Sequence, residues 1–565
     1  MKRSVTIIRW EHFRSRWRSA STYTLAIVLS LSLSACTTTT KNLNLEDHVV
    51  MVNGTGDLTD PRANIGDPSS GRHILFIPYD KLEHQDYYFH RLFSAVKNAP
   101  LSPEPGSRKR ILLFIHGGMN TAQASIERVK HVLKYREEIL KDGTYPIFIN
   151  WDSSLTSSYL DHLVNLRQGR LAEDWCCGAW KELGGWRHTG AEIAGHIARV
   201  VTTPAYFMFD VVRGTIRLPV DIYGVYAEMI STHWRKDRVD GTRENGPWAK
   251  MENCEDLYRD ARVGMTPRAD RMLCEFSKDV SSAHPIAQGL DKKSQVETAL
   301  QVSRAIFTFP VHIASGLVID AAGTGSWSAM HRRTTVMFNR DEDLWSQYPR
   351  LDSSGGIALF MTRFREFLKN NGGKDEWEVV LVGHSMGTIV VNEMIRQFGH
   401  PLDKTNVDRK PLFDKIVYMA AACSLRDYLN TIPHYLEEYG DQHDGQNGPK
   451  MYHLVLHDHA EAAEQFLGLS LPGSLLVWID GFFARPDSPL DLVAGRYQNL
   501  LRTVHLHDPP HIRQRVSLKA FGSGNLTKRR NPQDHGDFDN FPFWKEEFWR
   551  VTDKDPFSLQ RLRPN

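Results

Sequence analysis

The stretch VVLVGHSMGTIVV, residues 379–391, decides the fold of this 565-residue chain. It places Ser385 between two glycines, with a continuous apolar run before them and an apolar segment of helical period after them. A run that is apolar at every position is typical of a strand buried on both faces. Strand, tight turn and helix is the context in which G-x-S-x-G predicts a nucleophilic serine, because the turn strains the serine and the glycines allow close packing. An ordinary serine in a glycine-flanked turn is the alternative interpretation.

Apolar runs of the same kind recur along the chain, and helical patterns separate most of them. They cover residues 111–115, 146–150, 415–421, 452–456 and 515–521. This alternation predicts a doubly wound, mostly parallel α/β sheet with helices on both faces. Ligands of such sheets bind at the carboxyl ends of the strands, and Ser385 follows one of those ends.

The alternation stops between residues 151 and 355. This segment carries helix-like apolar stretches, notably 193–230 and 302–318. The longer one contains too many charged residues for a membrane span, and the shorter one is only marginally long enough. We therefore expect one α/β domain, formed by residues 72–150 and 356–565, interrupted by a helical cap or lid subdomain at 151–355.

The N-terminus has the features of an export signal. A basic leader precedes the apolar segment Thr22–Ala35, which ends in Leu33-Ser34-Ala35-Cys36. Small residues before a cysteine resemble the bacterial lipobox, which implies a signal peptide at 1–36, cleavage before Cys36 and lipid on its thiol. Thr37 in place of an acidic residue resembles the sorting pattern for the outer membrane. Residues 37–71 are polar and are predicted to form a flexible tether. A plain secretory signal or an uncleaved anchor is the alternative.

Composition excludes some classes of protein. Lys+Arg 69 against Asp+Glu 67 gives a net charge of +2, so nothing favours a nucleic-acid partner. A hydrophobic content of 41% and a charged content of 24% are globular values. Of the cysteines other than Cys36, Cys254 and Cys274 are a candidate disulfide pair in an oxidising compartment.

The serine motif and an earlier His116-Gly117-Gly118 together resemble the α/β-hydrolase fold of lipases and esterases. That resemblance implies the chain order Ser, then acid, then His. The histidine that fits is His535, which precedes a glycine in a loop after the last predicted strand. The resemblance also implies an oxyanion hole formed by the main-chain N–H groups of Met386 and Gly118, with Met119 as an alternative to Gly118.

The acid of the triad should follow the penultimate strand. Asp458, shortly after the run 452–456, is the first choice. Asp480, which closes the apolar run 475–479, is the rival, and Asp508 is a third candidate. Alternatively, each of these aspartates is a solvated carboxylate in a loop.

We expect no cofactor. No G-x-G-x-x-G follows a strand, and no CxxC or Cys/His spacing suggests zinc. A metal site is an alternative interpretation of a cluster formed by His505, His507, His511 and Asp508. Exposed residues of a strand, however, alternate in the same way as His505 and His507.

Together these features predict a lipid-anchored serine hydrolase of the bacterial outer membrane that cleaves carboxylic esters by a Ser385–His535–Asp458 mechanism. Its partners would be an ester or lipid substrate and, through Cys36, a membrane. The alternatives are an amide or peptide hydrolase, which the same triad supports, and a non-catalytic envelope protein that keeps the fold as an interaction surface. If the inserted segment is a mobile lid, activity should be higher on aggregated or membrane-presented esters.

Overall fold

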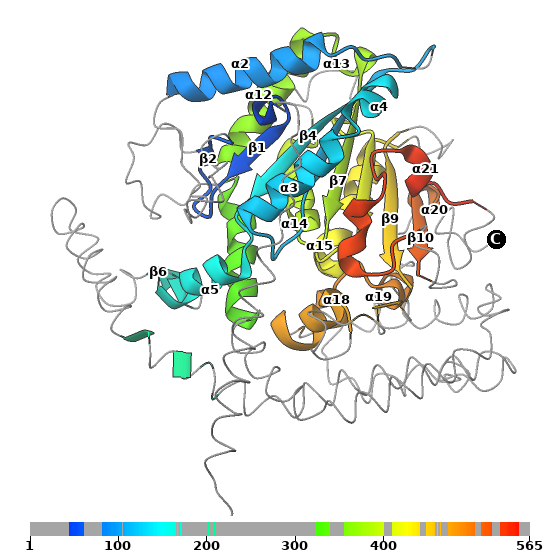
Figure 1. Ribbon diagram of the computed structural model, residues 1–565. Coiled ribbons are helices and arrows are strands. Elements are labelled where there is room, and N and C mark those ends of the chain that lie inside the picture. The colour runs from blue at the N-terminus through cyan, green and yellow to red at the C-terminus, as the bar shows by residue number, and fades with distance from the viewer. Residues whose placement is uncertain are drawn as a thin grey trace, which may run out of the picture. The chain divides into compact units, whose positions relative to one another are not determined.

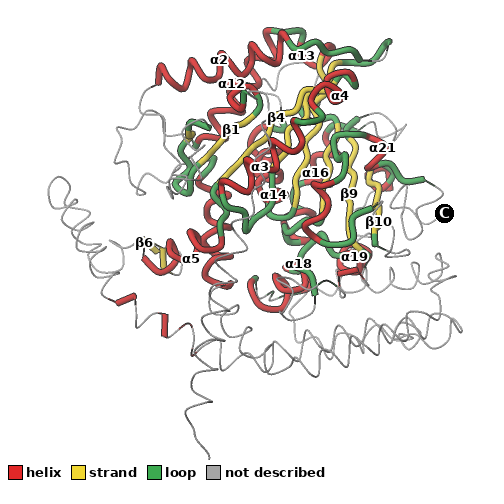
Figure 2. Tube along the Cα trace, in the orientation of Figure 1, coloured by secondary structure: helices red, strands yellow, loops and turns green. Residues whose placement is uncertain are grey.

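The structure is a computed structural model in which defined parts of the chain are described (Figure 2). They are residues 44–61, 82–103, 105–164, 323–338, 355–400, 410–440, 448–457, 473–484, 488–502, 510–522 and 531–552, with isolated residues between them. Apart from Asn44, all of these belong to one compact unit, Leu45–Asn565.

An eight-stranded sheet forms the centre of this unit, in the order β10-β9-β8-β7-β3-β4-β1-β2 (Figure 1). The strands are β1 Val49–Val52, β2 Leu58–Thr59, β3 Lys109–Ile115, β4 Thr144–Trp151, β7 Trp377–His384, β8 Lys415–Met419, β9 Lys450–Leu456 and β10 Val516–Phe521. Every neighbouring pair is parallel except β1 with β2. A short antiparallel pair, β5 Leu166–Arg167 and β6 Arg170–Leu171, lies outside this sheet. The predicted mostly parallel α/β sheet is confirmed.

Each predicted strand is present, and most positions of each apolar run are buried. Residues 111–115 of β3, all of β4 and residues 379–384 of β7 are inaccessible or nearly so. A strand between two parallel neighbours, with helices over both faces, has no side exposed to water, and so apolar residues occupy every position. The register places the ends of β3 and β7 together, since Ile115 pairs with Gly383.

Helices cover both faces of the sheet. In Figure 1, α3 (Ala122–Leu133) and α21 (Glu546–Trp549) lie in front of it, and α12 (Gly356–Asn370) and α14 (Gly387–Phe398) lie behind it. Further helices among the described residues are α2 Leu82–Asn98, α4 Arg136–Lys141, α5 Leu155–Val164, α13 Gly373–Glu376, α15 Leu425–Leu429, α16 Ile432–Glu438, α18 Leu475–Trp478, α19 Tyr497–Arg502 and α20 Pro510–Arg513. The run 475–479 is thus helical, and it continues into a π-helical turn, Ile479–Phe483.

Part of the predicted tether belongs to the sheet. Val49–Val52 forms β1, which pairs in parallel with β4 from Val49↔Phe148 to Val52↔Trp151. All four residues of β1 are fully buried. An apolar run of four residues in a polar segment gives no distinct sequence signal, and its pairing with β4 and β2 stabilises it as a strand. The folded domain therefore starts near Leu45 rather than at residue 72.

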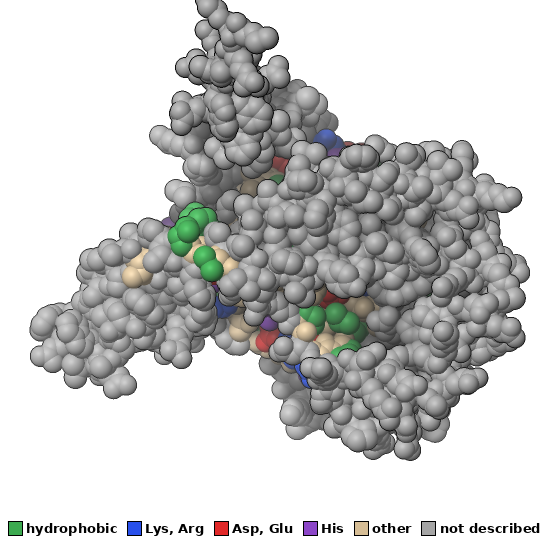
Figure 3. Space-filling model, turned by 90° about the horizontal axis from the view of Figure 1, so that it is seen from below, with side chains coloured by type: hydrophobic (Ala, Val, Ile, Leu, Met, Phe, Trp, Pro, Cys, Tyr) green, Lys and Arg blue, Asp and Glu red, His purple; other side chains and the backbone are tan. Residues whose placement is uncertain are grey.

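Few residues of the predicted insertion are described. They include α5 and a helical segment at 323–336. Several apolar side chains of this region are exposed by more than two fifths, namely Leu160, Phe207, Met208 and Val212. Figure 3 views the molecule from below, the side to which the strands of Figure 1 point, and small apolar groups are visible on that face. Among the described residues, no helix is sufficiently long and apolar to cross a membrane.

Ion pairs join the amino ends of β3, β7 and β8, opposite the end that carries Ser385. Glu378 of β7 lies 2.6 Å from Arg110 and 2.9 Å from Lys415. Burial would raise the pKa of Glu378, but Lys415 and Arg110 outweigh burial and lower that pKa from 4.5 to about 2. The ionised carboxylate therefore stabilises the fold above pH 4.5, and this contribution is lost as the pH falls from 4.5 toward 2.

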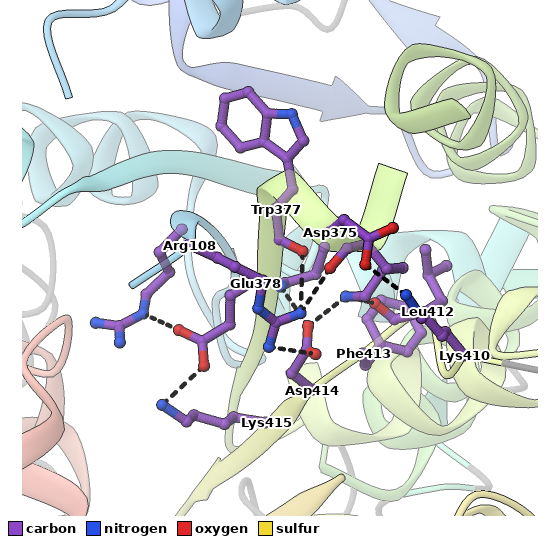
Figure 4. Close-up of polar contacts among 12 residues, drawn as sticks. Arg108, Asp375, Trp377, Glu378, Lys410, Leu412, Phe413, Asp414 and Lys415 are labelled. Atoms are coloured by element: carbon purple, nitrogen blue, oxygen red, sulfur yellow. Dashed lines mark hydrogen bonds and ion pairs between the residues drawn. The ribbon is translucent and has the colours of Figure 1, made fainter. Parts of the chain in front are cut away.

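Asp414 forms the second part of this cluster (Figure 4). Its carboxylate accepts a hydrogen bond from the Val379 main-chain N–H at 2.7 Å, lies 3.0 Å from Arg108 and forms an ion pair with Lys374. The side chains of Asp414 and Lys374 are only 15% and 13% exposed, so water screens this pair poorly. The cluster holds the loop before β8 against the start of β7.

Asp414→Asn is expected to destabilise the fold by about 2 kcal/mol, because it leaves the partly buried Lys374 without its counter-charge. The measurement is the free energy of unfolding in urea at pH 7. Asp375→Asn is the matched control, since Asp375 pairs with Lys410 in the same cluster (Figure 4) but its side chain is 84% exposed. We expect no measurable change there. Equal effects of the two variants would contradict the importance of burial.

Candidate active site

Ser385 occupies a strained turn between β7 and α14. Its φ is +51°, a left-handed conformation that residues other than glycine rarely adopt. The turn is fixed by β8 and the residues after it: the Ser385 N–H donates to Met419 O at 2.9 Å, and the Ala422 N–H donates to Ser385 O at 3.1 Å. A side chain at Gly387 would lie 2.4 Å from Ile115 O, so only glycine lets α14 start this close to β3. Two roles of the G-x-S-x-G motif, strain and close packing, are present.

His535 lies beside Ser385. Its Nε2 is 3.0 Å from Ser385 Oγ, and both side chains are almost inaccessible, at 5% and 2% exposed. His535 begins the 3-10 helix η6 (His535–Asn540), which a reciprocal capping box of Asp534 and Asp537 stabilises. The sequence prediction of these two residues as partners across 150 positions agrees with the geometry.

The protonation of His535 suits a base. Burial, reinforced by His384, holds the pKa of His535 well below its usual range, so the ring is neutral at pH 7. When Nε2 accepts from the Ser385 hydroxyl, the proton of the neutral ring is on Nδ1. Nδ1 is buried and has no hydrogen-bond partner among the described residues. A buried N–H of this kind costs free energy unless an acceptor is close.

Glu464 is the carboxylic acid that the structure brings to His535. Its Oε2 accepts a hydrogen bond of 2.8 Å from the His535 main-chain N–H. Among the described residues this carboxyl group bonds the main chain of His535, and no hydrogen bond joins it to Nδ1 of the ring. Burial, opposed in part by this hydrogen bond, raises the pKa of Glu464 from 4.5 to about 8. The acid is therefore mostly neutral at pH 7 until a positive charge forms beside it.

The predicted acids are placed differently. Asp458 and Asp508 lie outside the described residues. Asp480 is buried, and it accepts hydrogen bonds from Val493 N, Arg496 Nη1 and Asn499 Nδ2, at 2.8, 3.0 and 3.1 Å. No hydrogen bond among the described residues joins Asp480 to His535. Asp480 therefore stabilises the segment after the π-helical turn. Sequence reasoning missed Glu464, since it considered only aspartates near the ends of apolar runs.

The loop after β3 approaches the serine closely. A side chain at Gly117 would lie 2.7 Å from Ser385 Cβ, and one at Gly118 would lie 2.5 Å from Met386 Sδ. Contact with the serine turn therefore requires glycine at 117, whereas a side chain at 118 would meet the flexible side chain of Met386. The next residue, Met119, has a φ of +61° and is strained like Ser385. The two predicted donors of an oxyanion hole, Gly118 and Met386, are in adjacent turns.

Polar side chains fix the peptide plane between Gly117 and Gly118. The Gly117 carbonyl accepts from His116 Nδ1 at 2.7 Å, Asn120 Nδ2 at 3.0 Å and Ser153 Oγ at 3.2 Å. In a trans peptide the carbonyl and the following N–H point in opposite directions. Three donors on one side therefore direct the Gly118 N–H to the other side. Such preorganised N–H groups are what an oxyanion requires.

The remaining predictions concern metals and lipid. No cluster of ligands that could hold a metal ion occurs in the part of the chain that the structure describes. Cys36 and the predicted pair Cys254 and Cys274 lie outside that part, as do His505 and His507. Cys423, the cysteine that is described, is free and buried.

No protein-family model matches this chain. No curated protein and no solved structure is significantly similar to it.

Proposed function

We propose that this protein is a serine hydrolase that cleaves carboxylic esters, and that its sheet is an α/β-hydrolase fold with a helical subdomain inserted at residues 151–355. The observation that carries the proposal is the 3.0 Å contact between Ser385 Oγ and His535 Nε2. It occurs at a left-handed serine after the carboxyl end of a central parallel strand. A structural serine has no need of backbone strain and a buried neutral imidazole together.

In the acylation step, Ser385 Oγ attacks the carbonyl carbon of the ester while His535 Nε2 takes the hydroxyl proton. The carbonyl oxygen becomes an oxyanion that accepts hydrogen bonds from the Gly118 and Met386 N–H groups. Loss of one such donor typically costs 10²- to 10³-fold in kcat. Collapse of the tetrahedral intermediate breaks the bond to the alcohol oxygen, which receives the proton from Nε2. An acyl-Ser385 ester and a free alcohol result.

In the deacylation step, His535 Nε2 takes a proton from water, and the water oxygen attacks the acyl carbon. The second tetrahedral intermediate releases the carboxylic acid, and the proton on Nε2 returns to Ser385 Oγ. Both steps pass through an imidazolium at His535. We assign Glu464 to stabilise that cation, because its carboxyl group already bonds the main chain of the same histidine. Asp458 is the competing assignment from the sequence.

We further propose that lipid on Cys36 anchors the enzyme to the outer membrane of a bacterium. The sequence alone supports this part, through the basic leader and the Leu33–Cys36 pattern. Two or more acyl chains give stable attachment, whereas a single chain is marginal. Such a tether would keep the site near lipid esters at high effective concentration.

A fluorophosphonate probe tests the proposed function directly, because it phosphonylates only an activated serine. The purified protein is expected to incorporate one probe per chain, on the peptide that contains Ser385, as mass spectrometry of a digest would detect. Prior heat denaturation should abolish labelling. A folded protein that takes up no probe would favour a non-catalytic role, and labelling with hydrolysis of amides but not esters would favour a peptidase or amidase.

A further inference from the structure

His384 connects the element that carries the serine with the element that carries the base. It is the last residue of β7, directly before Ser385, and its ring is 4% exposed. Its Nε2 lies 3.1 Å from the main-chain carbonyl oxygen of His535. A carbonyl only accepts, so this nitrogen carries the proton. The bond spans 151 residues of sequence and is buried throughout.

The surroundings of His384 keep its ring neutral and in place. Burial, together with Arg128, lowers the pKa of His384 to about 4, so at neutral pH the ring holds one proton. Its Nδ1 faces Asp539 Oδ2 at 3.9 Å, and Asp539 pairs with Arg128 Nε at 2.5 Å. The ring also packs against Phe538, with centroids 6.2 Å apart. Helix α3, strand β7 and η6 therefore meet at this histidine.

The two main-chain groups of His535 are bonded from different directions. Its N–H donates to Glu464, and its carbonyl accepts from His384. The N–H belongs to the peptide plane before the residue, and the carbonyl belongs to the plane after it. When both planes are fixed, the direction of the Cα–Cβ bond is fixed as well. That direction decides whether the imidazole reaches Ser385.

We propose that His384 is a positioning residue for the base: its Nε2–H holds the His535 carbonyl so that the imidazole points at Ser385 Oγ. The inference rests on the proposed function and adds to it a role for the second residue of the G-H-S-M-G motif. This role differs from that of Gly383 and Gly387, which the turn needs because they are small. It also predicts that the donor atom, rather than the ring, is what the site requires.

A pair of variants tests this. The amide nitrogen of glutamine reaches the position of histidine Nε2, whereas that of asparagine reaches only the position of Nδ1. His384→Asn is expected to lower kcat on p-nitrophenyl butyrate on the order of ten- to a hundredfold, because a misplaced base costs that much. KM should stay within about twofold, and His384→Gln should keep kcat within about threefold of the parent. Thermal unfolding should respond similarly to both variants.

Equal losses of kcat in His384→Asn and His384→Gln would overturn the proposal, as would an unchanged kcat in His384→Asn. If the asparagine variant does not fold, His384→Ser, which also has no donor at that distance, replaces it. A crystal structure of the asparagine variant provides a second readout that does not depend on turnover. A longer separation of His535 Nε2 from Ser385 Oγ than 3.0 Å supports the role, and an unmoved His535 rejects it. An inert parent protein would count against the proposed hydrolase instead.

Discussion

Ser385→Ala is expected to lower kcat for ester hydrolysis on the order of 10⁴- to 10⁶-fold, since it removes the oxygen atom that lies beside His535 Nε2 and would form the acyl-enzyme. The measurement is hydrolysis of p-nitrophenyl esters by purified protein, with active-site titration to exclude contaminating parent enzyme. Substrate binding should survive, so an ester analogue should bind both proteins with similar Kd. A variant that retains a tenth or more of the parent rate would contradict the assignment of Ser385.

The stability of variants at this position gives a control. Alanine keeps the strained φ of +51°, so the free energy of unfolding of Ser385→Ala should stay within about 1 kcal/mol of the parent. Ser385→Gly relieves that strain, so its free energy of unfolding is expected to be about 1 kcal/mol higher than that of the parent. This variant should remain inactive. A more stable glycine variant would show that the left-handed conformation of Ser385 costs folding free energy.

Glu464→Gln is expected to lower kcat on the order of 10³-fold, because a neutral amide cannot stabilise the imidazolium at His535. Asp458→Asn, measured beside it, separates the two candidate acids. We expect the glutamine variant to show the large loss and the Asp458 variant to stay within about tenfold of the parent. The opposite result would restore Asp458 as the acid and leave Glu464 as a main-chain anchor for His535.

The pH profile provides a signature of the same residue. Glu464 ionises with a pKa of about 8, so kcat/KM should rise with pH through about 8 rather than near the usual pKa of a histidine. This rise of kcat/KM with pH should disappear in Glu464→Gln.

The raised pKa of Glu464 also affects the stability of the fold. The folded chain keeps a proton that the unfolded chain loses above 4.5, so stability should fall as the pH rises from 4.5 to about 8, and less so in the variant.

The sequence predicted the sheet well because parallel strands buried on both faces are apolar at every position, and the runs at 111–115 and 379–382 show this plainly. The contact between Ser385 and His535 was predictable for a related reason: one stands in a turn with recognisable glycines, and the other follows the last apolar run. Local sequence patterns were enough to predict those strands and residues whose positions depend on local structure.

Long-range contacts determine what was missed. Glu464 contacts His535 only because the chain folds η6 beside it, and no spacing in the sequence predicts that contact. The strand Val49–Val52 is stabilised by its pairing with β4. By its composition, the apolar run 475–479 could form a strand or a helix. In the structure it is buried as a short helix that leads into a π-helical turn.

The pairing of β3 with β7 at the centre of the sheet has a consequence for how the protein is made. Arg110 and Glu378, neighbours in these strands, are 268 residues apart in the chain. At about 10 residues per second, a ribosome needs roughly half a minute between them. During that time one edge of β3 has no partner, and an open apolar edge invites aggregation. Closure of so large a loop is also slow. We therefore expect the nascent chain to need this edge of β3 covered, by solvent-exposed segments or by a chaperone, until β7 has been synthesised.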